Sequence, residues 1–196
     1  MTCFIFIKAN ILIDHDCHAR LADFGLLTII SDATITASSS YVKGGTTRWM
    51  SPELLNPDMF GFKESRPTKE SDCYALGMVV LEVLSGRPPL ASDKDFIVMR
   101  KIMDGERPER PEGPEGAWFT DDLWRMLQLC WAARPEGRPS VEEALECLER
   151  VSRAWKPPSQ ALDGDVGADK DDLNHTIVSD YFAWFLISVP FFPRSS

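Results

Sequence analysis

The segment from Glu70 to Gly86 limits the possible folds more than any other part of the chain. It reads ESDCYALGMVVLEVLSG, and from Tyr74 to Leu84 apolar residues fall on nearly every face of a helix. A helix without a polar face must be surrounded by other elements, so we expect this one at the centre of a helical domain. Gly86 suits the C′ position, and prolines at 88 and 89 prevent the helix from continuing.

Three further helices are predicted beside this central one. Residues 92–105 indicate a shorter helix that ends at Gly105, and residues 120–132 indicate one with Thr120 as its N-cap. The last helix begins at PSVEE, where Ser140 and Glu143 have the spacing of a capping box. The predicted apolar faces of these last two helices consist of Leu123, Met126, Leu127, Cys130 and Trp131, and of Val141, Ala144, Leu145, Leu148 and Trp155.

The sequence before these helices is predicted to contain little regular structure. ANILID and ARLADF flank the turn HDCH and are typical of a short hairpin. Residues 26–44 are rich in Ser and Thr without a clear period, which favours a loop. Helical signals begin at SPELL, residues 51–55. The expected fold is therefore a mostly α-helical lobe with a short β-hairpin.

Composition excludes several classes of function. The chain has 196 residues and a net charge of −9, which argues against nonspecific binding to nucleic acid or to anionic membranes. Five cysteines without a CxxC pair indicate reduced core thiols in an intracellular, cytoplasmic protein. The apolar run YFAWFLISVPFF near the end has only twelve residues and a proline, so it is too short for a transmembrane span.

Several motifs follow one another in an order that identifies a family. Asn10 precedes the hairpin, and Asp23, Phe24 and Gly25 form the tripeptide DFG after it. GTTRWMSPE follows at residues 45–53, then the apolar helix, then CWAARPEGRPS. In this order and spacing, the chain resembles the C-terminal lobe of a eukaryotic protein kinase. The segment RWMSPE, with Trp49, resembles the tyrosine-kinase-like branch of Ser/Thr kinases.

The resemblance implies phosphoryl transfer from ATP to serine or threonine of a protein substrate. Asn10 and Asp23 then correspond to the Mg²⁺ ligands that bind the nucleotide, with Asp23 supplying a hard anionic oxygen and Asn10 a neutral one. Without the family context, Asn10 reads as a turn residue and Asp23 as a loop cap. Residues implied for the activation segment are Phe24, Gly25, Thr46, Thr47, Pro52 and Glu53.

Two motif residues have implied structural roles. Glu53 is expected to form a buried ion pair with Arg138, and the alternative is two unrelated surface charges. Asp72 is expected to accept hydrogen bonds from the catalytic-loop backbone. Its alternative role is a carboxylate that the helix dipole favours at the helix start. Thr46 corresponds to a threonine that contacts the catalytic aspartate in Ser/Thr-specific kinases.

The catalytic aspartate of the family has no counterpart in this chain. The pattern H-R-D-L would fall on Cys3, Phe4, Ile5 and Phe6, and Ile5 cannot orient a hydroxyl, so no catalytic residue is assigned. The family lysine would fall on Ile7, and Lys8 is one residue too late. The sequence also contains no GxGxxG loop and no Val-Ala-Ile-Lys strand, so the N-terminal lobe is not represented.

Three hypotheses remain open from these observations. The chain is part of a Ser/Thr protein kinase and inactive alone, or it is a noncatalytic, pseudokinase-like module that binds a partner protein. The third is an unstable product without a function. We also expect part of the central helix to be exposed, because helices that cover it in the family precede residue 10. The expected boundaries are a non-family start at 1–9, the kinase lobe at 10–155, an acidic linker at 156–175 and a hydrophobic tail at 176–196.

The loop after DFG carries hydroxyls where the family places regulatory phosphates. A phosphate there needs an arginine partner, and the usual position for it is Phe4. A switching role is therefore in question, and a solvated polar loop is the alternative. The hydroxyl residues are Thr28, Ser31, Thr34, Thr36, Ser38, Ser39, Ser40 and Tyr41.

Overall fold

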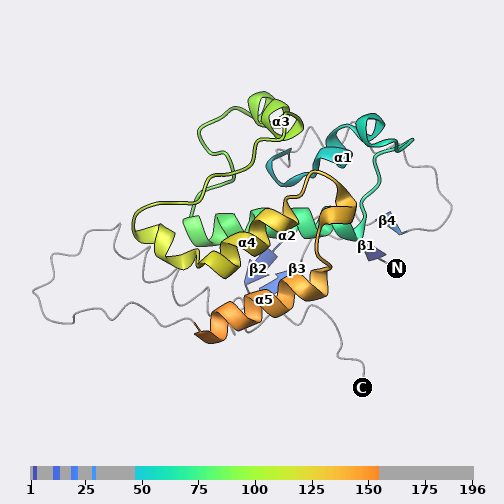
Figure 1. Ribbon diagram of the computed structural model, residues 1–196. Helices are drawn as coiled ribbons and strands as arrows, with labels where there is room; N and C mark the ends of the chain where they lie inside the picture. Colours follow the sequence, from blue (N-terminus) through green and yellow to red (C-terminus); the bar gives the residue numbers. More distant parts are fainter. Residues whose placement is uncertain (1, 4–10, 14–18, 22–27, 30–46, 155–196) are drawn as a thin grey trace, which may run out of the picture.

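The computed structural model describes residues 2–3, 11–13, 19–21, 28–29 and 47–154. Its helical part confirms the predicted fold class, a mostly α-helical lobe (Figure 1). The α-helices are α1 (Pro52–Leu55), α2 (Lys69–Ser85), α3 (Asp95–Met103), α4 (Asp121–Cys130) and α5 (Val141–Ala154). Short 3-10 helices are η4 (Thr47–Trp49), η5 (Pro57–Phe60), η6 (Pro114–Trp118) and η7 (Pro135–Gly137).

Two small antiparallel pairs of strands precede the helices. Strands β2 (Ile11–Ile13) and β3 (Ala19–Leu21) form the predicted hairpin, in which Ile11 pairs with Leu21 and Ile13 with Ala19. Strand β1 (Thr2–Cys3) pairs with β4 (Thr28–Ile29). The segment 26–44 was predicted to be a loop, so the strand at 28–29 corrects that prediction at its start.

Helix α2 begins and ends with local signals. The Thr68 side chain accepts from the Ser71 backbone N–H at 3.2 Å, and the Ser71 hydroxyl accepts from the Thr68 N–H at 2.8 Å, which forms a capping box. At the other end, Gly86 has φ 68°, the left-handed conformation that glycine adopts without strain. Local interactions therefore fix where α2 begins and ends, and tertiary packing fixes its position in the lobe.

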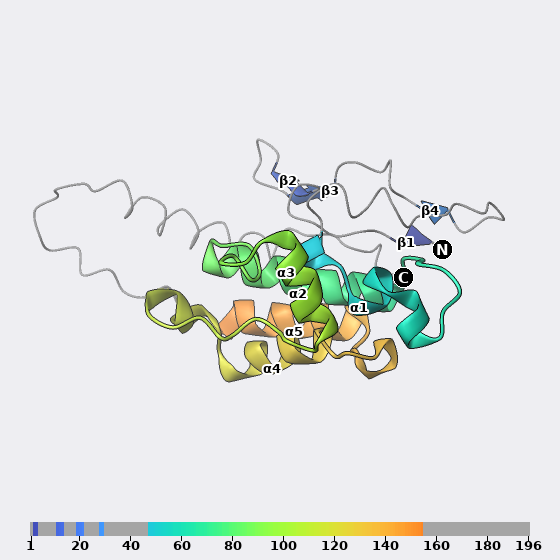
Figure 2. The same cartoon turned by 90° about the horizontal axis from the view of Figure 1, so that it is seen from above.

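Helix α2 runs through the middle of the lobe, with α4 and α5 beside it in both views (Figures 1 and 2). Residues 71–82 and Leu84 are all buried. The expectation of an exposed face on this helix was therefore wrong. The reason is physical: α4, α5, η4 and η6 contribute apolar side chains that cover α2 from several directions.

The apolar faces of α4 and α5 complete the core. In α4, Leu123, Leu127 and Cys130 are buried as predicted. In α5 the buried residues are Ala144, Cys147, Leu148 and Val151, whereas Leu145, predicted to face inward, is partly exposed and Trp155 lies outside the described residues. The spacing i, i+3, i+4, i+7 places the stripe slightly further around the helix than we predicted.

Gly77 allows α2 and α4 to approach closely. A Cβ at this position would lie 2.7 Å from Trp131 Nε1 and 3.0 Å from Cys130 Cβ. Both neighbours are buried, with exposed fractions of 2%, so neither side chain has room to move away. The missing side chain therefore sets the distance between these helices.

Gly77→Ala is expected to lower the free energy of unfolding by about 1–3 kcal/mol, because overpacking outweighs the better helix propensity of alanine. Urea unfolding followed by circular dichroism measures the change. The matched control is Gly137→Ala, whose Cβ would meet Ala132 at an ordinary 3.5 Å and should stay within about 0.5 kcal/mol of the unmodified chain. Equal stability of the two variants would contradict this packing argument.

Candidate functional site

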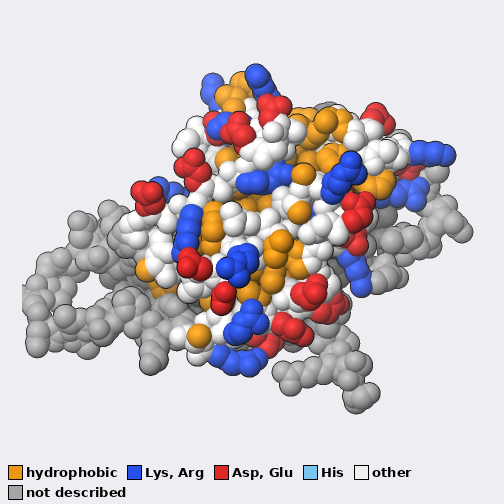
Figure 3. Space-filling model, viewed as in Figure 1, with side chains coloured by type: hydrophobic (Ala, Val, Ile, Leu, Met, Phe, Trp, Pro, Cys, Tyr) orange, Lys and Arg blue, Asp and Glu red, His pale blue; other side chains and the backbone are white. Residues whose placement is uncertain are grey.

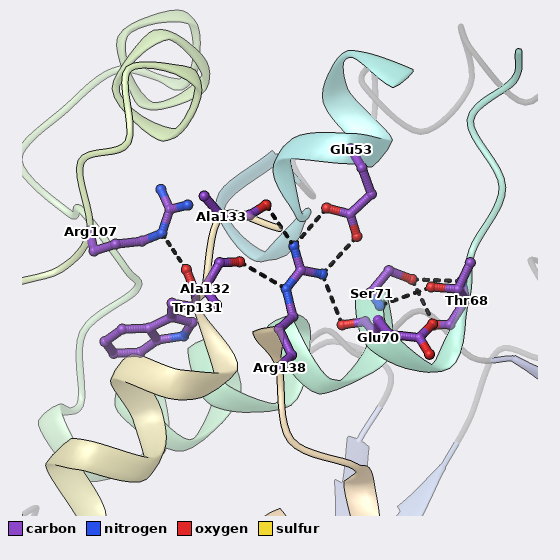
Figure 4. A network of polar contacts seen from close by, with 9 residues as sticks. All are labelled: Glu53, Thr68, Glu70, Ser71, Arg107, Trp131, Ala132, Ala133 and Arg138. Atoms are coloured by element: carbon purple, nitrogen blue, oxygen red, sulfur yellow. Dashed lines mark hydrogen bonds and ion pairs between the residues drawn. The ribbon is translucent and has the colours of Figure 1, made fainter. Parts of the chain in front are cut away.

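A buried ion pair between Glu53 and Arg138 lies at the centre of the polar contacts of this lobe (Figure 4). Arg138 Nη1 donates to Glu53 Oε1, and Nη2 donates to Oε2, both at 2.7 Å. The remaining N–H groups donate to the carbonyls of Glu70 at 3.0 Å, Ala132 at 3.0 Å and Ala133 at 3.4 Å. All five donors of the guanidinium are therefore used, as a buried charge requires.

The pair joins three parts of the chain that are far apart in sequence. Glu53 is in the first turn of α1, directly after Pro52, and Arg138 directly follows η7. The Glu70 carbonyl belongs to the first turn of α2. The ion pair thus connects the segment that leads into α1 with the start of the central helix and with the connection between α4 and α5.

Arg48 fixes the other end of the same segment. Its guanidinium donates to the carbonyls of Pro89 at 3.0 Å, Leu90 at 2.6 Å and Asp93 at 2.5 Å, and to Asp95 Oδ1 at 3.0 Å. Leu90 has φ 51°, which is rare for a residue with a side chain. The bonds from Arg48 help to hold this strained connection between α2 and α3 against η4.

Trp49 attaches the segment to α2 between these two arginine sites. Trp49 Nε1 donates to Glu82 Oε2 at 3.1 Å, and Glu82 is 5% exposed. Thr47 is buried as well. Residues 47–53, which we call the anchored segment, therefore contact the helical core at both ends and in the middle.

Tyr74 connects the ion pair to a second arginine. Its ring lies 5.1 Å from the guanidinium carbon of Arg138 and 5.6 Å from that of Arg107, a cation–π arrangement with both. Arg107 Nε also donates to the Trp131 carbonyl at 2.8 Å. Burial raises the pKa of Tyr74 to about 12, although the two nearby arginines act in the opposite direction.

The structure describes only part of the residues that the sequence assigned to the site. Thr47, Pro52 and Glu53 are buried within the anchored segment, and the implied pair of Glu53 with Arg138 is present. Asp72 is buried in the first turn of α2, but its expected partners in the catalytic loop lie outside the described residues. Also outside them lie Ile5, Asn10, Asp23, Phe24, Gly25 and Thr46.

Sequence reasoning missed Arg48, Glu82 and Arg107. Arg48 and Arg107 lie in segments where a charged side chain is usually exposed to solvent. Trp49 was noted only as a mark of a kinase branch, although its indole binds Glu82. A charged residue inside the all-apolar helix was the one available signal for Glu82, since a buried charge needs a partner. Among the described residues, no group of three or more His, Cys, Asp or Glu side chains is arranged to hold a metal ion.

Comparison with known proteins now decides the family. The family model for protein tyrosine and serine/threonine kinases matches residues 7–148. The chain belongs to the protein kinase family. The match includes the hairpin, the anchored segment and all five α-helices apart from the last turns of α5.

Several relatives of this chain are named serine/threonine kinases. The chain is 29% identical to receptor-interacting serine/threonine-protein kinase 3 of Rattus norvegicus over 88% of its own length and 35% of the relative. It is 29% identical to the Homo sapiens protein of that name, over 85% and 31%. Serine/threonine-protein kinase VIK of Arabidopsis thaliana is 31% identical over 68% and 28%. The chain thus spans about a third of the length of these kinases.

Glu53→Gln should reduce the free energy of unfolding by about 3–5 kcal/mol, because it leaves the Arg138 charge buried without its counter-ion. The measurement is urea unfolding of the full chain. Glu149→Gln serves as the control, since Glu149 pairs with Arg153 at 2.7 Å where the side chains are 42% and 77% exposed. That variant should change stability by less than about 1 kcal/mol. A small, equal effect of both would show that the buried pair is not needed.

Tyr74→Phe is expected to leave the lobe as stable or more stable at neutral pH, because the Tyr74 hydroxyl is buried and finds no hydrogen-bond partner among the described residues. With Tyr74 in place, the unfolded chain loses its proton from about pH 10 and the folded chain only near pH 12. Stability should therefore fall between these values as pH rises. Comparing unfolding of both chains from pH 8 to 12 tests this, and an equal pH dependence would contradict it.

Proposed function

We propose that this chain forms the helical lobe of a Ser/Thr protein kinase domain and holds the segment that presents a protein substrate. The observation that carries the proposal is the anchored segment, which Arg138 and Arg48 attach to the helical core at its two ends. A substrate platform must keep its shape while substrates enter and leave, and buried charge-assisted bonds provide that rigidity. The similarity to named serine/threonine kinases supports the substrate class.

Asn10 and Asp23 are the proposed ligands of Mg²⁺ and, through it, of ATP. The antiparallel hairpin supports this assignment. Because Ile11 pairs with Leu21, the chain enters β2 and leaves β3 at the same end of the hairpin. Asn10 directly precedes β2 and Asp23 follows β3 by two residues. When bound, the metal neutralises charge on the transferring phosphate, and an amide and a carboxylate oxygen are suitable donors for it.

We infer that this chain alone does not transfer phosphate. Ile5 stands at the position of the catalytic aspartate, and an aliphatic side chain neither accepts a proton nor orients a hydroxyl. A cytoplasmic location is part of the same proposal. It is supported by Cys73, Cys130 and Cys147, which are free and buried, as expected under reducing conditions. No helix among the described residues has the length and apolar character to cross a membrane.

A partner-binding module without catalysis is the second candidate. The observation that favours it is a set of large apolar side chains on the surface: Met59 is 66% exposed, Phe62 42% and Phe96 71%. Figure 3 shows apolar side chains gathered on the face that carries α1 and α3. Exposed apolar groups of this size are typical of surfaces that contact another protein.

Nucleotide binding by the purified chain tests the inferred inactivity and the assignment of Asn10 and Asp23. We expect titration with a fluorescent ATP analogue and Mg²⁺ to give a Kd above about 1 mM, because two metal ligands supply little affinity. Phosphate transfer to a generic Ser/Thr substrate should not exceed that of Asp23→Ala. Micromolar, Mg²⁺-dependent binding that Asp23→Ala removes would overturn the inference of inactivity and favour an enzyme. Micromolar binding that survives both Asn10→Ala and Asp23→Ala would overturn the ligand assignment.

A further inference from the structure

Two cysteines face each other across the contact between α2 and α4. Cys73 Sγ and Cys130 Sγ lie 3.6 Å apart, although the residues are 57 positions apart in sequence. Both are buried, with exposed fractions of 0% and 2%. Gly77, one helical turn after Cys73, lets the two backbones approach closely enough for the sulfurs to meet.

The surroundings make the two thiols unequal. The hydrogen bond with Cys130 lowers the pKa of Cys73 below its ordinary value, and the Arg138 charge acts in the same direction against burial. The same hydrogen bond and burial raise the pKa of Cys130. Cys73 is thus the thiol that more readily forms a thiolate, and the Cys130 sulfur lies 3.6 Å from it.

A third buried thiol, Cys147, has a backbone carbonyl as its neighbour. Cys147 on α5 is buried, and its sulfur lies 4.0 Å from the Asp122 carbonyl. Burial raises the pKa of the Cys147 thiol. Cys147 therefore offers a control within the same core: a buried thiol with the same chemistry, for which the described part of the chain shows no thiol at hydrogen-bonding distance.

We propose that Cys73 and Cys130 are a redox pair that a peroxide converts into a disulfide between α2 and α4. The Cys73 thiolate attacks one oxygen of hydrogen peroxide, which breaks the O–O bond and leaves a sulfenic acid and hydroxide. The Cys130 thiol then attacks the sulfenic sulfur. The S–S bond forms, the hydroxyl of the sulfenic acid leaves, and it takes the Cys130 proton to become water.

The fold is compatible with each step. Hydrogen peroxide is uncharged and about the size of water, so local opening of the core is sufficient for entry, and the reaction is expected to be slow. The sulfurs must approach by about 1.5 Å to reach bonding distance, which side-chain rotation and a small helix shift provide. The disulfide would link α4 to α2. The first turn of α2 contains the Glu70 carbonyl, which accepts a hydrogen bond from Arg138.

The test uses the full chain, reduced, purified and then treated with hydrogen peroxide. After removal of peroxide, free thiols are alkylated in denaturant and the cross-linked peptides are identified by mass spectrometry. Trypsin alone leaves Cys130 and Cys147 in one peptide, because Arg134 and Arg138 both precede proline. Glu-C digestion after Glu136 separates them, so the disulfide can be assigned to one cysteine.

The expected result is a Cys73–Cys130 cross-link that accumulates with peroxide, raises Tm by about 5 °C or more and disappears with dithiothreitol. Cys147→Ser should keep the cross-link and the shift. Cys130→Ala should lose both, while its circular dichroism spectrum reports whether it folds. Combining Cys3→Ser, Cys17→Ser and Cys147→Ser in one chain removes every competing thiol.

Two results would overturn the proposal. One is alkylation of both Cys73 and Cys130 after peroxide treatment of the folded chain, with no cross-link between them. The other is a cross-link that joins Cys130 to Cys147 and is lost in Cys147→Ser. Folding of each variant is checked separately, so neither result can arise from an unfolded protein. Neither depends on nucleotide binding, and failure here leaves the proposed kinase function untouched.

Discussion

The Glu53–Arg138 ion pair is the contact on which the arrangement of this lobe depends. It satisfies all five donors of a buried guanidinium and joins residues 85 positions apart. Removing two charges from water costs several kcal/mol per ion, so such a pair contributes little net stability relative to apolar residues. Its value lies in geometry. Only one placement of the anchored segment satisfies a planar, bidentate fork.

Apolar packing and the Glu53–Arg138 ion pair make different contributions to this fold. The buried surfaces of α2, α4 and α5 provide the driving force for folding, but apolar contacts are non-directional. Three arginines donate hydrogen bonds to backbone carbonyls outside the helix interiors: Arg48 to Pro89, Arg107 to Trp131 and Arg138 to Ala132. Directional bonds to the connections therefore fix how the loops lie on a core that hydrophobic burial has assembled.

Sequence predicted the features that depend on local chemistry. The central helix, its glycine end at Gly86, the Thr120 cap and the Ser140–Glu143 capping box all follow from neighbouring residues, and the structure contains each of them. The buried stripe of α5 was misplaced at Leu145, because propensity and period cannot fix the rotation of a helix that packs on two others.

Some residues of the candidate site were predictable from sequence and others were not. Family motifs identified Glu53 and Arg138, whereas no periodicity links two charges 85 residues apart. The bonds from Arg48 to the connection between α2 and α3 depend on backbone carbonyls, which every residue has, so sequence carries no mark of them. Asn10 and Asp23 remain predictions from the motif, since they lie outside the described residues.

The all-round burial of α2 has a consequence for synthesis of the chain. During translation α2 leaves the ribosome before the two helices that cover it: α4 is complete at Cys130 and α5 only at Ala154. At about 5–20 residues per second, the stretch from the end of α2 at Ser85 to the end of α5 at Ala154 takes roughly 3–14 s to make. During that time the apolar surface of α2 lacks the cover of α5, and at first that of α4, so it is exposed to aggregation and to chaperones that bind apolar segments.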